Sequence, residues 1–219
     1  MEQKVKIIAC RTLKHEIEMF KPPEVDAVYL ESGYHRLPKQ LREMIQSYID
    51  EEKEAEVIIF GFGLCSNGLA GLYSNDKTLI IPKVHDCIGV LLGSREAYNK
   101  EFRAHPGTYY LSKGWIDELR DPYAEYLDYV KQYGEEMAQW LIDMQYHNYT
   151  RVAFIYDYLP EQEKYEDYSR KVAEFLGVKF EKIQGKSDFF EKLISGDWDS
   201  NNFVITPPGQ TVKSKDFFY

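Results

Sequence analysis

Short apolar runs rich in β-branched residues alternate with amphipathic helical segments along the whole chain, and this alternation limits the fold more than any other feature. Such runs predict strands at 4–10, 25–30, 56–60, 78–82, 108–112, 151–157, 178–183 and within 201–211. Helical periodicity is clearest at 38–49, 122–147 and 161–176. The pattern predicts a three-layer α/β fold, a mainly parallel sheet with helices on both faces. We expect one domain over residues 1–219, with the long helix at 122–147 as the best place for a subdivision.

Composition excludes several classes of partner and location. At 219 residues and 44% hydrophobic content, the chain can bury a substantial core. Its net charge of -9 repels a polyanion, so we expect no nucleic acid partner. No apolar stretch approaches the roughly 20 residues that span a bilayer, so no membrane partner is expected. Three cysteines, an odd number, do not suggest a disulfide framework, and we expect a cytoplasmic protein with reduced thiols.

The three cysteines each follow a predicted strand. Cys10 ends the first strand, Cys65 follows the strand at 56–60, and Cys87 follows the strand at 78–82. The carboxyl ends of parallel strands lie on one edge of a sheet, where crossover loops form the ligand crevice. If these strands are neighbours, the three sulfurs meet there. The alternative is that each cysteine is a small buried hydrophobe.

The stretch GFGLCSNG, residues 61–68, places Cys65 among glycines. Glycine permits positive φ and close backbone approach, which a core position does not need. We therefore expect a binding pocket shaped by Gly61, Gly63, Asn67 and Gly68, with Arg11 as a positive contact for an anionic ligand. The stretch matches a dinucleotide fingerprint weakly, because the third glycine is not at its proper place.

The segment VHDC adds a histidine two residues before Cys87, and a helix is expected to begin just afterwards, capped by Asp86 or Cys87. A helix N-terminus stabilises a thiolate, the form of cysteine that binds metals or acts as a nucleophile. Cys10, Cys65, Cys87 and His85 form a soft ligand set for tetrahedral zinc, or three thiolates for an iron–sulfur cluster.

Four blocks in the first 120 residues resemble one family. The blocks IACRTLKHEIE, GFGLCSNGLAGL, IPKVHDCIGVLLGSREAY and PGTYYLSKGW, in this order, are similar to the domain of unknown function 1638. The resemblance implies a setting in anaerobic one-carbon metabolism, beside corrinoid-dependent methyltransferases, and implies no particular reaction. The triplet His85-Asp86-Cys87 also resembles the His-x-Cys half of the zinc site in cobamide-dependent thiol methyltransferases. In those enzymes the further cysteine follows the pair, whereas Cys10 and Cys65 precede it.

These observations predict a metal-binding protein with zinc or an iron–sulfur cluster, and they favour a metal-dependent transferase or a redox enzyme without settling that it is an enzyme. The resemblance adds a corrinoid as a candidate further cofactor. Its partner would be a small molecule or a corrinoid protein. One alternative is a non-catalytic carrier of metal or corrinoid. Another is a cysteine hydrolase using Cys65, His85 or His35, and Asp86. The tyrosine-rich stripe at 123–146 is typical of core or of a homodimer seam.

Overall fold

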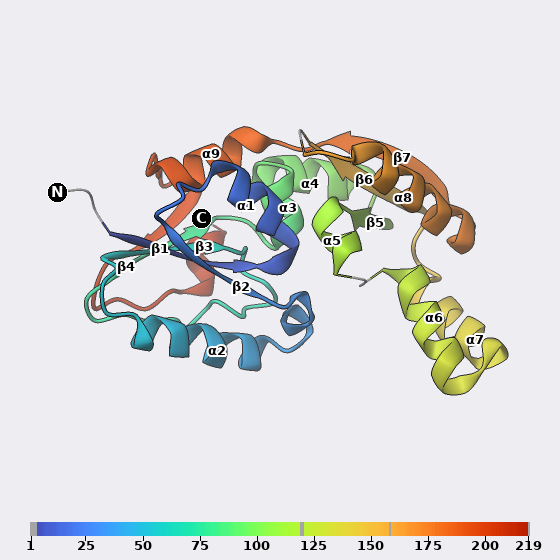
Figure 1. Cartoon of the computed structure of the whole chain (residues 1–219), viewed down its shortest axis with the longest axis horizontal. Coiled ribbons are helices and arrows are strands. Elements are labelled where there is room, and N and C mark those ends of the chain that lie inside the picture. The colour runs from blue at the N-terminus through green and yellow to red at the C-terminus, as the bar shows by residue number, and fades with distance from the viewer. Residues whose placement is uncertain (1–3, 119–120, 158, 219) are drawn as a thin grey trace. The chain divides into compact units, whose positions relative to one another are not determined.

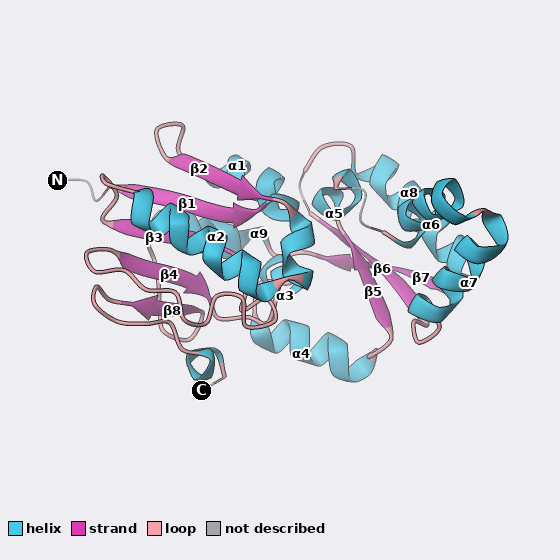
Figure 2. Cartoon of the chain, turned by 90° about the horizontal axis from the view of Figure 1, so that it is seen from below, coloured by secondary structure: helices cyan, strands magenta, loops and turns pink. Residues whose placement is uncertain are grey.

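The chain folds into two compact units in the computed structural model, which describes residues 4–118, 121–157 and 159–218. The first unit combines residues 1–98 with 186–219, and the second, which we call the central unit, comprises residues 99–185. Each unit has its own sheet and its own helices, with mainly parallel strands, so the fold is of the α/β class (Figures 1 and 2).

The first unit is built on a five-stranded sheet in the order β2-β1-β3-β4-β8. Its strands are β1 (Val5–Cys10), β2 (Asp26–Leu30), β3 (Val57–Gly61), β4 (Thr78–Pro82) and β8 (Phe203–Thr206). The first four are parallel to one another, and β8 is antiparallel to β4. All five residues of β3 are buried because helices cover both faces of the sheet, as the unbroken apolar run VIIFG requires.

The helices of this unit lie on both faces of the sheet, with α2 on one side and α1, α3 and α9 on the other (Figure 1). They are α1 (Lys14–Phe20), α2 (Pro38–Glu51), α3 (Cys87–Leu91) and α9 (Ser187–Ser195), with short 3-10 turns η1 (Arg11–Leu13), η2 (Ser32–Arg36) and η3 (Ser214–Phe217). The stripe predicted for α2 is its buried face, since Leu41, Ile45 and Ile49 recur every four residues and are at most 2% exposed.

The central unit contains a parallel three-stranded sheet in the order β5-β6-β7 (Figure 2). Its strands are β5 (Thr108–Leu111), β6 (Arg151–Tyr156) and β7 (Lys179–Gln184), and its helices are α5 (Lys113–Asp117), α6 (Pro122–Tyr133), α7 (Glu135–Tyr146) and α8 (Gln162–Leu176). Helix α4 (Arg95–Ala104) contains the point at which the chain passes from one unit to the other. Helix α8 ends at Gly177 in the left-handed conformation, as the sequence predicts.

The single long helix expected at 122–147 is wrong, because two helices occupy this segment. Gly134, between α6 and α7, has φ 82° and ψ 165°, a conformation that breaks the helix and that other residues rarely adopt. The two helices lie side by side (Figure 1), and the Tyr146 hydroxyl donates to Glu125 at 2.7 Å. Much of the predicted aromatic stripe is exposed rather than core, including Tyr133 and Trp140 at 58% and 56%.

Within the described ranges, every helix is too short or too polar to cross a bilayer.

Candidate functional site

The three cysteines lie at one edge of the first unit's sheet. Cys10 is the last residue of β1, Cys65 follows β3 by four residues, and Cys87 is the first residue of α3, which comes after β4. Strand β3 pairs in parallel with β1 on one side and with β4 on the other, so the carboxyl ends of all three strands are adjacent. We call Cys10, Cys65 and Cys87 the thiol cluster. Among the described residues they form no disulfide.

The thiols of the cluster are close enough for the charge of one to affect another. Burial raises the pKa of the Cys65 thiol well above its usual range, and negative charge on Cys10 and Asp86 raises it further. The pKa of Cys87 is raised in the same way, by burial first and then by Cys10, Asp86 and Cys65. All three side chains are only 7–8% exposed. Cys65 and Cys87 are therefore buried, protonated thiols at neutral pH, which makes them poor nucleophiles in this form.

Two loops are joined edge to edge to form the site. The backbone N–H of Leu64 donates to the carbonyl of Val84 at 2.9 Å, and that of Cys65 donates to the carbonyl of His85 at 2.8 Å. Gly63 permits this approach, since a Cβ there would lie 2.6 Å from the backbone nitrogen of Asp86. Because Gly63 has no side chain, the loop that carries Cys65 can pack against the segment that leads into Cys87.

The Cys65 loop makes a left-handed turn. Cys65, Ser66 and Asn67 have φ of 46°, 54° and 67°, and Gly68 N–H donates to the Cys65 carbonyl at 2.8 Å. This conformation costs about 1–2 kcal/mol for each residue that is not glycine, so the surroundings must enforce it. One enforcing contact is a hydrogen bond from Arg42 Nη2 to the Asn67 carbonyl at 2.9 Å.

Gly61 and Arg11 were also expected to contribute to a binding pocket. Gly61 lies at the end of β3, where a Cβ would meet the Cβ of Ala9 at 2.5 Å and Ile17 Cδ1 at 2.6 Å, so it allows close packing between elements. The positive φ values of this loop belong to Cys65, Ser66 and Asn67. Gly61 is instead a position at which the backbone packs closely against a neighbouring strand and helix. Arg11 is exposed at the start of η1, directly after Cys10.

Asp86 caps helix α3, as the sequence predicts. Its Oδ1 accepts from the backbone N–H of Ile88 at 2.9 Å and of Gly89 at 3.3 Å. Burial raises the pKa of Asp86, whereas these two hydrogen bonds and electrostatic interaction with His85 and His35 lower it. The Asp86 carboxyl group is therefore near enough to both imidazoles, and to Cys65 and Cys87, to interact with them electrostatically.

The two imidazoles are held by different contacts. The His85 ring lies 5.7 Å from the ring of Tyr98 and 5.3 Å from that of Phe218. His35 Nδ1 lies 2.5 Å from the Ser32 carbonyl. Because a carbonyl only accepts, Nδ1 is the donor, and the lone pair of the neutral ring is then on Nε2. The sequence indicated His35 only as an alternative base, and its place after β2 at the same edge was the available signal.

Thr12 is a member of the site that the sequence did not indicate. Its hydroxyl donates to Cys10 Sγ at 3.1 Å, and the side chain is fully buried. A side-chain hydrogen bond from Thr12 also partly offsets the rise in the pKa of Cys87. The hydroxyl has a single hydrogen, and it stabilises the ionised form of the thiol that accepts it. Its position two residues after Cys10, past the end of β1, was the signal that could have identified it.

The site has soft donor atoms in a buried place, but they do not yet form a coordination shell. Across the residues that the structure describes, no three His, Cys, Asp or Glu side chains are placed as a ready ligand group for a metal ion. The donor chemistry, three sulfurs with imidazoles nearby, fits a thiophilic ion such as Zn²⁺.

A family model described as "Protein of unknown function (DUF1638)" matches residues 29–194. The matched range includes Cys65, His85 and Cys87, whereas Cys10 precedes it. Comparisons with curated proteins and with solved structures gave no match. The match spans well over half of the chain, and the chain therefore belongs to the DUF1638 family.

Proposed function

We propose that this protein binds a single thiophilic metal ion, Zn²⁺, through Cys10, Cys65 and Cys87, with an imidazole of His85 or His35 as the fourth ligand. The observation that carries the proposal is that three buried thiols lie at or just beyond the adjacent carboxyl ends of three neighbouring parallel strands. Cysteines that serve only as small core residues have no reason to gather at one edge of a sheet from positions this far apart in the sequence. The proposed location is a reducing compartment, the cytoplasm, which keeps the thiols available.

The raised pKa values favour metal binding over free nucleophilic chemistry. A buried thiolate lacks solvation, so Cys65 and Cys87 hold their protons until a cation replaces them. A bound divalent ion compensates the charge that burial otherwise penalises. Thr12 supports the ionised form by its hydrogen bond to Cys10 Sγ. The same residues that disfavour a hydrolase therefore suit a metal site.

The number of protein ligands would determine the role of the ion. Four protein ligands give a closed structural zinc site, whereas three thiolates alone leave a position at which zinc acts as a Lewis acid or activates a substrate thiol. Asp86 fixes the amino end of α3 and thereby positions Cys87. His35 presents Nε2 as its lone-pair nitrogen, and His85 is oriented by two aromatic rings.

The test is metal analysis of protein purified without oxygen. Zinc, iron and acid-labile sulfide per chain are measured for the wild type and for Cys10→Ser, Cys65→Ser and Cys87→Ser. We expect about one zinc per wild-type chain and a large loss in each variant, because each removes one ligand. Circular dichroism checks that the variants are folded. Absence of metal after purification and after zinc reconstitution would overturn the proposal.

Matched histidine variants identify the fourth ligand. His85→Ala and His35→Ala are compared with His147→Ala, which removes an imidazole from an exposed position after α7. We expect one of the first two to weaken zinc binding and His147→Ala to leave it unchanged. Equal retention of zinc in all three variants would show that no imidazole completes the site. Iron with sulfide in place of zinc would replace the single ion by a cluster.

A further inference from the structure

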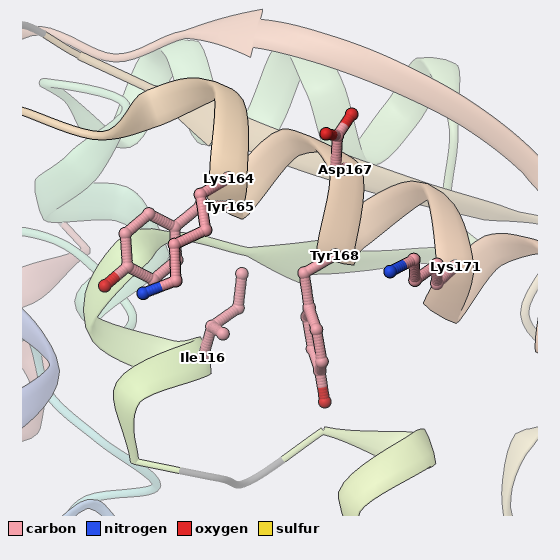
Figure 3. A pocket seen from close by; sticks show the side chains of 6 residues that line it. All are labelled: Ile116, Lys164, Tyr165, Asp167, Tyr168 and Lys171. Carbon is pink, nitrogen blue, oxygen red and sulfur yellow. The ribbon is translucent and has the colours of Figure 1, made fainter.

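The central unit contains a pocket along helix α8 that is independent of the thiol cluster. Its volume is about 360 Å³, within the range of small-molecule sites. Among the described residues it is lined by one residue of α5 and five of α8: Ile116, Lys164, Tyr165, Asp167, Tyr168 and Lys171 (Figure 3). These five positions recur along one side of α8, so a single regular helix provides most of the lining.

Two tyrosine rings form fixed apolar walls of this pocket. The Tyr165 hydroxyl donates to Asp117 Oδ1 at 2.7 Å and accepts from Lys113 Nζ at 2.6 Å. The Tyr168 hydroxyl donates to the carboxylate of Asp121, with oxygen separations of 3.0 and 3.2 Å. Both phenols are thus held by partners outside the pocket. The rings are fixed in place before any ligand arrives, which lowers the entropic cost of binding.

The polar groups at the pocket are mainly cationic. Lys164 Nζ lies 5.4 Å from the centre of the Tyr165 ring, so the ammonium group makes a cation–π contact with this ring. Lys171 lies at the other end of the row and extends toward Tyr168 (Figure 3). Asp167 borders the pocket as well, but its carboxylate points away from Ile116 and Tyr168 in this view. In this view the Tyr168 ring stands between Ile116 and Lys171, so the face of the ring on the Lys171 side borders a positive charge.

We propose that this pocket binds a small planar aromatic molecule that carries one anionic group. The ring of the ligand stacks on the face of Tyr168 that borders Lys171, and the anionic group pairs with the Lys171 ammonium. Nucleoside monophosphates and aromatic carboxylic acids share this chemistry. Polyanions do not, since the chain has a net charge of -9 and the described lining of the pocket carries two cations, Lys164 and Lys171.

The experiment is isothermal titration calorimetry of the full chain with defined probes. AMP carries ring and charge together, adenosine carries the ring alone, and ribose 5-phosphate carries the charge alone. Indole-3-acetate provides the carboxylate source. We expect AMP or indole-3-acetate to bind at least tenfold more tightly than adenosine or ribose 5-phosphate. Tighter binding of AMP identifies a phosphate ligand, and tighter binding of indole-3-acetate identifies a carboxylate.

Variants connect the binding to this pocket. Lys171→Gln is expected to weaken the anionic probe about tenfold and to leave adenosine unchanged, whereas Lys131→Gln makes the same charge change on exposed α6 and leaves both unchanged. Tyr168→Leu removes the stacking surface and weakens every ring probe, while Tyr168→Phe keeps the ring and retains binding. If no probe binds at millimolar concentration, or if Lys171→Gln behaves like Lys131→Gln, the pocket has no such ligand.

Discussion

The pH dependence of zinc affinity follows directly from the buried state of the thiols. Burial raises the pKa of Cys65 and of Cys87 far above the ordinary thiol value of about 8.5. Both side chains are therefore protonated throughout the range from pH 6.5 to pH 9. A zinc ion that binds both sulfurs must displace both protons, so its affinity rises as protons become scarcer.

The magnitude is set by the number of protons released. Each displaced proton multiplies the association constant by ten per pH unit, so Cys65 and Cys87 together give about a hundredfold rise per unit. Cys10 adds up to a further tenfold while its thiol is protonated. Thiols with the ordinary pKa would give a slope that flattens near pH 8.5, whereas thiols with raised pKa values keep the slope to pH 9.

The assay is a competition titration of the zinc-free protein against a chelator whose own proton dependence is known. We expect the logarithm of the zinc association constant to rise by two to three per pH unit, without flattening before pH 9. Cys65→Ser should lower the slope by one. A slope of one or less, or a plateau near pH 8.5, would refute the argument that the ligands are buried, protonated thiols.

Further variants test the architecture around the cluster. Gly63→Ala should cost at least about 1–3 kcal/mol of unfolding free energy in urea, because its Cβ would meet the Asp86 backbone at 2.6 Å, whereas Gly68→Ala meets mainly the flexible end of Leu41 and should cost less. Asp86→Ala should lower the melting temperature, because the lost helix cap contributes about 1 kcal/mol to stability. Asp86→Asn should largely preserve the melting temperature, because asparagine also caps helices. In the metal-free protein the pKa of the Cys65 thiol is higher in the folded chain than in the unfolded chain, so the unfolded chain loses this proton first as the pH rises. The contribution of the Cys65 thiol to the free energy of unfolding is therefore complete below about pH 8.5. Above that pH the wild type should lose about 1.4 kcal/mol per pH unit relative to Cys65→Ala.

The strands and their ends could be predicted from the sequence because apolar runs bounded by turn residues carry a strong local signal. Strand β4 was predicted at its observed bounds, and β1 ends at Cys10 as expected. The cap at Asp86 and the left-handed Gly177 were equally local. The alternation of strands and helices predicted a mainly parallel sheet, but it did not predict which strands are neighbours, and the observed order puts β3 between β1 and β4.

What the sequence did not predict depends on contacts between distant segments. The left-handed turn at Cys65, Ser66 and Asn67 has no local signal, since its conformation is enforced by neighbours such as Arg42. The contact of Thr12 with Cys10 needs the chain to turn sharply after β1. The division of the strands into two sheets was not predicted either. A pattern of strands along the sequence does not show where one sheet ends and another begins.

The most direct measurement of the central claim is X-ray absorption at the zinc edge of the reconstituted protein. We expect three sulfur neighbours at about 2.3 Å and one nitrogen at about 2.0–2.1 Å from the ion. Each cysteine variant that still binds zinc should lose one sulfur. A shell of oxygen and nitrogen alone, or a single sulfur, would contradict the claim that Cys10, Cys65 and Cys87 form one metal site.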